Sequence, residues 1–165
     1  MERRLLSIYL NDHLAGATGA IALVRRSLSR NADHPVGVFL TGLLPELESD
    51  RASLVGVMRR LEVAASPVKQ AAGWTLEKVG RLKLNGSLTG YTPLARLEEL
   101  EALRMGIDGK LALWEALAET STVDHRLQRS EFEALADRAR AQRDELEKFR
   151  VEAAKEAFQT SVAPD

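Results

Sequence analysis

Leucine, alanine and valine recur at every third or fourth position along most of this chain, and polar or charged residues separate them. This spacing places apolar side chains on one face of an α-helix, whereas a strand would need alternate positions. Prolines and short polar stretches interrupt the pattern where helices begin and end. The pattern predicts long helices at about 4–30, 35–63, 93–119 and 128–158, and a shorter one at about 67–84.

Two of the expected helices have clear start signals, in which Pro35 follows His34 and Pro93 follows Thr92. Proline suits the first helical turn because its missing N–H would be unpaired there, and threonine is a good N-cap. Pro45 lies inside the second expected helix, where it removes one backbone hydrogen bond. Because the apolar spacing resumes in phase after Pro45, we expect a kink rather than a break.

The lengths of the connections predict how the helices are arranged. Short turns at about 29–33 and 120–124 favour two antiparallel helical hairpins. The stretch from 64 to 92 is long enough to cross from one end of a bundle to the other. Two hairpins joined by a long crossover are typical of ferritin-like proteins. We therefore expect one all-α domain, a ferritin-like four-helix bundle whose crossover carries the shorter helix.

Composition narrows the possible functions. The formal net charge is −1 and both signs are interspersed, so the chain lacks the basic surface of a nucleic-acid-binding protein and we expect no nucleic-acid partner. The chain has no cysteine, which excludes thiol catalysis, disulfides and cysteine-ligated zinc. Aromatic residues make up only 5%, so the core must consist mainly of leucine, valine and alanine.

Hydropathy predicts no membrane association. No uncharged stretch reaches the roughly 18 apolar residues that a membrane-spanning helix needs. The apolar residues at 5–10 are too few for a signal peptide, because Asn11, Asp12 and His13 follow them directly. The absence of cysteine fits a reducing compartment, although it is also compatible with secretion. We expect a cytoplasmic protein.

Parts of two expected helices resemble a set of small bacterial ferritin-like proteins. The first helix of that set is similar to residues 9–19, YLNDHLAGATG. Its third helix is similar to residues 97–103, LEELEAL, together with 106–114, GIDGKLALW. Because the spacing between these segments also matches, the resemblance extends over nearly the whole chain. That set has no established activity, so the resemblance implies a fold rather than a function.

Di-iron bundles of the ferritin-like class bind their metals with one Glu from each of two helices and a Glu-x-x-His pair from each of the others. The three histidines of this chain are His13, His34 and His125, and none has a glutamate three residues before it. Arg51 stands three residues after Glu48, where the class would have histidine, and the equivalent pair of the last helix would be Ala139 and Gln142. An arginine is always protonated and cannot coordinate a metal.

The residues expected at mid-height of the bundle therefore do not form the usual ligand set. These residues are His13, Glu48, Arg51, Glu101 and Gln142. We interpret them as a degenerate metal site, held by ion pairs and hydrogen bonds, with no cofactor. The functional interpretation that follows is a non-catalytic bundle acting in structure or protein interaction, as a homodimer because two-fold oligomers are common.

Two alternatives remain open. The first is a metal-binding or oxidoreductase ferritin-like protein that uses His13 with Glu48 or Glu101. The second is a module that binds a small apolar ligand. Gly16, Gly19, Ala20 and Ala22 make the middle of the first helix thin, which permits close approach of a neighbouring helix. The second alternative places an apolar cavity there.

Overall fold

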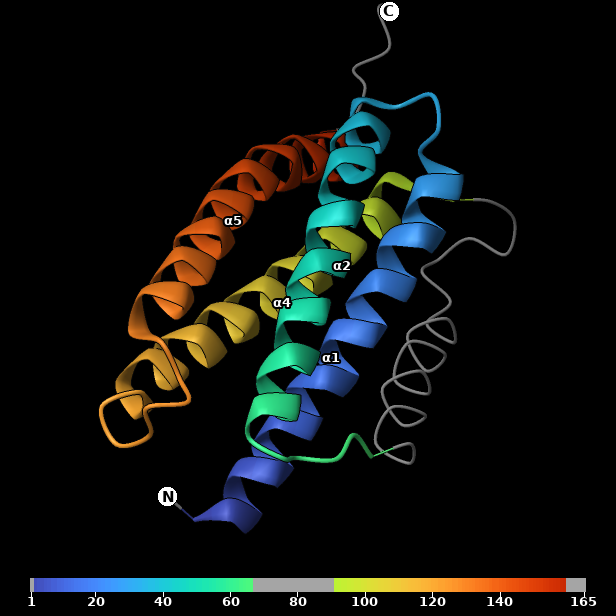
Figure 1. The fold of residues 1–165 in the computed structure, drawn as a ribbon. Helices are drawn as coiled ribbons and strands as arrows, with labels where there is room; N and C mark the ends of the chain where they lie inside the picture. Colours follow the sequence, from blue (N-terminus) through green and yellow to red (C-terminus); the bar gives the residue numbers. More distant parts are fainter. Residues whose placement is uncertain (1, 67–90, 160–165) are drawn as a thin grey trace, which may run out of the picture.

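The computed structural model describes residues 2–66 and 91–159, which contain four helices (Figure 1). They are α1 (Arg3–Arg30), α2 (Pro35–Arg60), α4 (Pro93–Thr120) and α5 (Arg129–Phe158). No strand occurs in these two ranges, so the expected all-α class is confirmed. The shorter helix expected at 67–84 lies outside the described residues.

Helices α2 and α4 begin at the positions that their start signals predict. The ring nitrogen Nδ1 of His34 accepts a hydrogen bond from the backbone N–H of Val36 at 3.2 Å. The hydroxyl of Thr92 accepts one from the backbone N–H of Ala95 at 3.1 Å. A proline follows each capping residue in the first turn. Each cap pairs a backbone donor that the helix itself cannot pair.

Helix α2 continues through Pro45, which lies on its exposed side. Because Pro45 has no backbone N–H, one helical hydrogen bond is absent, but the helix does not break there. The helix ends at Arg60, before the expected position 63. Glu62 has a φ of 57°, a left-handed backbone conformation that cannot continue an α-helix.

The helices form two hairpins, α1 with α2 and α4 with α5 (Figure 1). Helix α1 packs on α4, and α2 packs on α5, so α1–α5 and α2–α4 are the diagonal pairs. Ion pairs give the directions. Arg30 near the end of α1 pairs with Glu99 near the start of α4. Arg60 at the end of α2 pairs with Glu131 at the start of α5. Both neighbouring pairs across the hairpins are therefore antiparallel.

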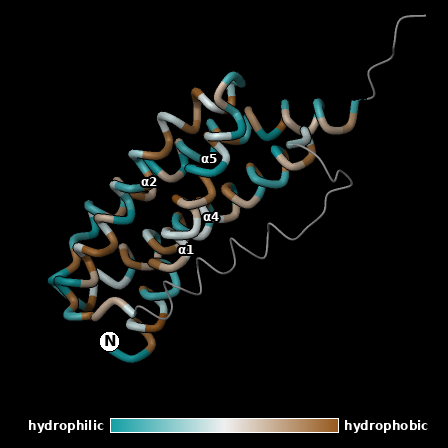
Figure 2. The backbone as a smooth tube through the Cα atoms, turned by 90° about the vertical axis from the view of Figure 1, so that its right-hand side faces the viewer, coloured by the Kyte–Doolittle hydropathy of each residue, from teal (hydrophilic) through white to brown (hydrophobic). Residues whose placement is uncertain are grey.

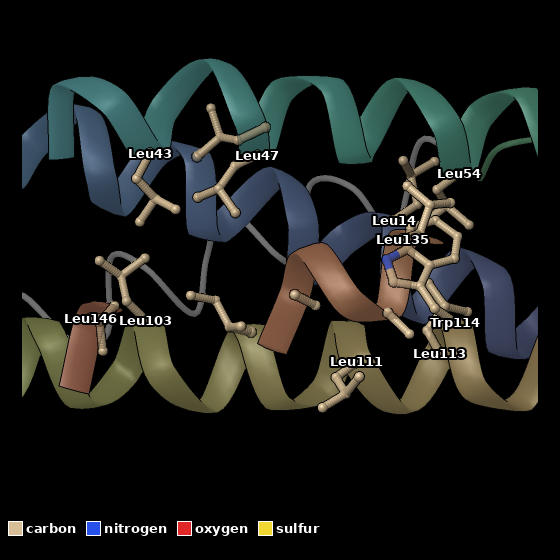
Figure 3. Close-up of a cluster of buried hydrophobic side chains, with 14 of the residues drawn as sticks. Leu14, Leu43, Leu47, Leu54, Leu103, Leu111, Leu113, Trp114, Leu135 and Leu146 are labelled. Carbon is tan, nitrogen blue, oxygen red and sulfur yellow. The ribbon is translucent and has the colours of Figure 1, made fainter. Parts of the chain in front are cut away.

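The core lies between the four helices, each of which has both hydrophobic and hydrophilic positions along it (Figure 2). Leucines of α2 and α4 face each other across the core (Figure 3). Trp114 of α4 and Phe132 of α5 are fully buried and stack with ring centroids 6.2 Å apart. Each fully buried leucine stabilises the fold by roughly 1.5–3 kcal/mol relative to an exposed one.

The sequence predicts no membrane-spanning helix. None of the helices in the described ranges is long and apolar enough to cross a membrane.

Candidate functional site

A pocket of about 260 Å³ lies between α1, α2 and α4. Each helix contributes residues at helical spacing, which is why one face of each helix lines it. The lining of α1 is Asp12, His13, Gly16, Ala17 and Ala20; that of α2 is Leu47, Asp50, Arg51 and Leu54; that of α4 is Leu103, Gly106, Ile107, Gly109, Lys110, Leu113 and Trp114.

Glycine and alanine keep the pocket open. A Cβ atom at Gly16 or at Gly109 would meet no atom within 4 Å. A Cβ at Gly106 would lie 3.9 Å from the side chain of Ala20, which is ordinary van der Waals contact. The pocket therefore exists because small residues of α1 and α4 lie opposite each other. A close contact between the two backbones does not explain these glycines.

The buried carboxylate of Asp50 lies in the wall of the pocket with 3% of its surface exposed. Lys110 donates from Nζ to Asp50 Oδ2 at 2.5 Å, and Arg138 donates to the other carboxylate oxygen. Two cations from two helices thus surround one carboxylate of a third helix. Burial of a carboxylate without such partners would be strongly unfavourable.

Gln142 of α5 extends this arrangement. Its side-chain oxygen accepts a hydrogen bond from Lys110, and its side-chain nitrogen donates to Glu46 Oε2 at 2.7 Å. Burial lowers the pKa of Lys110, while the nearby carboxylate of Asp50 opposes this shift. We call Glu46, Asp50, Lys110, Arg138 and Gln142 the central polar network.

Arg51 lies one residue after Asp50 and also lines the pocket, but it is not a member of this network. Its Nε donates to the hydroxyl of Thr18 at 3.2 Å, and that hydroxyl donates to the carbonyl oxygen of Leu14 at 2.9 Å. These bonds hold the guanidinium of Arg51 by one nitrogen only.

His13 lies on the α1 side of the pocket, half-buried, with its ring edge-on to Tyr9 at a centroid distance of 4.5 Å. Burial lowers the pKa of His13, and the neighbouring Asp12 carboxylate opposes this shift less strongly. Burial therefore favours the neutral form of the imidazole.

The five residues expected at mid-height do not come together in one place. His13 and Arg51 line the pocket, and Gln142 belongs to the central polar network. Glu48 instead pairs with Arg25 at 2.6 Å at the surface. Glu101 is likewise exposed, and its carboxylate lies 3.5 Å from Arg150.

The central polar network was largely missed from the sequence. Only Gln142 was expected there, because the ferritin-like pattern directs attention to glutamates and histidines. Asp50, Lys110 and Arg138 each lie at helical spacing from leucine or alanine residues, but charged residues on a helix are usually exposed. Their burial can be recognised only when the register of α2, α4 and α5 is known.

These side chains do not suit a metal ion. Across residues 2–66 and 91–159, no three histidine, aspartate or glutamate side chains converge closely enough to bind one. The cations Lys110 and Arg138 already satisfy both oxygens of Asp50. The central polar network can hold buried charges, and the pocket beside it offers a mainly apolar space.

A second polar cluster lies at the other end of α1, around the buried side chains of Asn31 and Glu99. The hydroxyl of Tyr91 donates to Glu99 Oε2 at 2.9 Å and accepts from Asn31 Nδ2 at 2.9 Å. Arg96 donates from Nε to Asn31 Oδ1 at 2.7 Å. These bonds tie the turn between α1 and α2 to the start of α4.

Comparison with known proteins gives no relative: no protein-family model matches the chain, and neither a curated protein nor a solved structure is significantly similar to it.

Proposed function

We propose that this chain is a non-catalytic, ferritin-like four-helix bundle that binds a small and mainly apolar molecule between α1, α2 and α4. The observation that carries the proposal is the pocket of about 260 Å³ beside Gly16 and Gly109. Its size supports the proposal, because a cavity of about 150 Å³ in a helical protein can bind benzene.

The lining of the pocket supports a binding role. Leucine, isoleucine and tryptophan side chains from α2 and α4 provide an apolar wall, and the lining also includes a few charged groups. Ligand pockets generally combine a mainly apolar wall with a small number of polar groups. A pocket of this kind between helices of a bundle is a usual place for a ligand.

The arrangement of the helices supports the ferritin-like part of the proposal. Two hairpins, α1–α2 and α4–α5, pack with α1 against α4 and α2 against α5. The central polar network takes the place where ferritin-like proteins bind metal, and the ammonium of Lys110 stands among its carboxylates. A lysine there favours a bundle without metal chemistry. The homodimer and the protein-interaction role stay predictions, which light scattering of the purified chain would begin to test.

Calorimetric titration of the full chain with indole, a compact apolar molecule, tests the binding proposal. Gly109→Leu places a large side chain in the pocket and should abolish the heat of binding. Gly42→Leu is the matched control, because Gly42 is exposed on α2, lies away from the pocket, and has no atom within 4 Å of an added Cβ.

Two results would contradict the proposal. One is equal binding of indole to the wild-type chain and to Gly109→Leu, and the other is no binding to the wild-type chain. Gly16→Leu fills the pocket from α1 and serves as a second variant should Gly109→Leu fail to fold, as judged by circular dichroism.

A further inference from the structure

Arg51 differs from the other charged groups that line the pocket. Its Nε is held by Thr18, whereas its two terminal nitrogens make no ion pair with any residue in the described ranges. A guanidinium presents two parallel N–H donors that match the two oxygens of a carboxylate. Resting on the proposed binding function, we propose that the ligand is a small monocarboxylate whose carboxylate pairs with Arg51 and whose apolar body fills the pocket.

The remaining charges of the pocket are already balanced or screened. The ammonium of Lys110 is engaged by Asp50 and Gln142, and the second oxygen of Asp50 is engaged by Arg138. Asp12 is exposed, so water screens its repulsion of an anion. Arg51 is therefore the lining cation that is available to a ligand.

The neutral state of His13 fits the same ligand class. A protonated imidazole would offer a second cation, but burial lowers the pKa of His13 and so favours its neutral form. One cation then faces one acid group. A monocarboxylate matches this charge better than a dicarboxylate or a phosphate monoester, which would bring a second negative charge into a mostly apolar pocket.

The pocket volume limits the apolar body. Scaling from benzene in a cavity of about 150 Å³, a pocket of about 260 Å³ holds on the order of ten non-hydrogen atoms. Small residues of α1 and the apolar side chains of Leu103, Ile107 and Leu113 surround this space. A short aliphatic or aromatic acid fits these limits.

Fluorescence of Trp114 tests the inference directly, because Trp114 lines the pocket. The chain has two tryptophans, and Trp74→Phe in the full chain leaves Trp114 as the reporter. Octanoate and 1-octanol are the probes, since they share an apolar chain and differ in the carboxylate. We expect octanoate to bind about ten-fold or more tightly than octanol at pH 7, because a hydrogen bond to a charged group is worth that much.

The variant Arg51→Gln should lower the affinity for octanoate by about ten-fold or more and leave that for octanol unchanged. Arg51→Lys keeps the charge but not the paired donors, and should give an intermediate affinity. Arg25→Gln is the matched control, since Arg25 is an exposed arginine of α1 outside the pocket. It should bind octanoate as the parent chain does.

The outcomes separate this inference from the proposed function. Equal affinity for octanoate and octanol, or an unchanged affinity for octanoate in both Arg51 variants, overturns the inference and leaves the pocket as a site for neutral molecules. Binding of neither probe, together with no binding of indole, overturns both. A preference for octanoate that falls in Arg51→Gln and not in Arg25→Gln supports both.

Discussion

Lys110 of α4 and Asp50 of α2 meet across the diagonal of the bundle, with Nζ 2.5 Å from Oδ2. The backbones of these two helices do not pack on each other, so the long side chain of Lys110 makes the connection. Arg138 of α5 reaches the same carboxylate from another side. One buried carboxylate therefore fixes three helices relative to one another, and this gives the first prediction.

Asp50→Asn should lower the free energy of unfolding by about 2–4 kcal/mol. Removal of one partner from a fully buried ion pair costs about 3–5 kcal/mol, and partial exposure of Arg138 reduces this cost. Urea unfolding followed by circular dichroism measures the difference. Glu48→Gln is the control, because the exposed pair of Glu48 and Arg25 should contribute less than about 1 kcal/mol. Equal effects of the two substitutions would contradict the importance of the network.

Two glycines should respond in opposite ways to alanine. Gly109→Ala should raise the free energy of unfolding by about 0.5–1 kcal/mol, because alanine favours the helix and its Cβ would enter open space. Gly37→Ala should lower it by about 2 kcal/mol or more, because the Cβ would lie 2.0 Å from the backbone oxygen of Asn31.

Chemical unfolding of both glycine variants and the parent chain tests this contrast. A stable Gly37→Ala variant would mean that the turn before α2 is not packed as tightly as its geometry indicates. A destabilised Gly109→Ala variant would mean that the pocket beside α4 is filled in the protein.

Tyr91→Phe should lower the free energy of unfolding by about 1–2 kcal/mol, because the buried carboxylate of Glu99 loses a hydroxyl donor at 2.9 Å. Tyr9→Phe is the matched control, since Tyr9 packs its ring against His13 and its hydroxyl bonds to no other described residue. Thermal unfolding of the two variants should separate them. A loss of stability as large in Tyr9→Phe would contradict this account of the cluster around Glu99.

The sequence predicted more of the fold than of the site. Apolar stripes and proline starts depend on neighbours a few residues apart, so they predicted where α2 and α4 begin. The end of α2 was less clear, because nothing in the sequence singles out Glu62 for a left-handed backbone.

The site depends on contacts between residues far apart in sequence. Asp50 and Arg138 meet only because the helical register brings them together. A shift of one position would turn either residue toward solvent, and the sequence does not fix that register. The sequence shows that glycine makes α1 thin, but whether a thin helix admits a neighbouring helix or leaves a pocket depends on the spacing of α1 and α4.

His13 should make the stability of the fold decrease as the pH falls below about 7. Burial lowers its pKa in the folded chain below the ordinary value of 6.5, so the unfolded chain binds the proton more readily. Stability is therefore complete above pH 6.5 and falls as the pH decreases toward the folded pKa. Asp12 opposes this shift but is the weaker influence.

His13→Gln should remove this component of the pH dependence, whereas His125→Gln, at an exposed position, should retain it. Titration of the imidazole signals by nuclear magnetic resonance gives the direct measurement, and a midpoint for His13 at or above 6.5 would show that the charge of Asp12 outweighs burial.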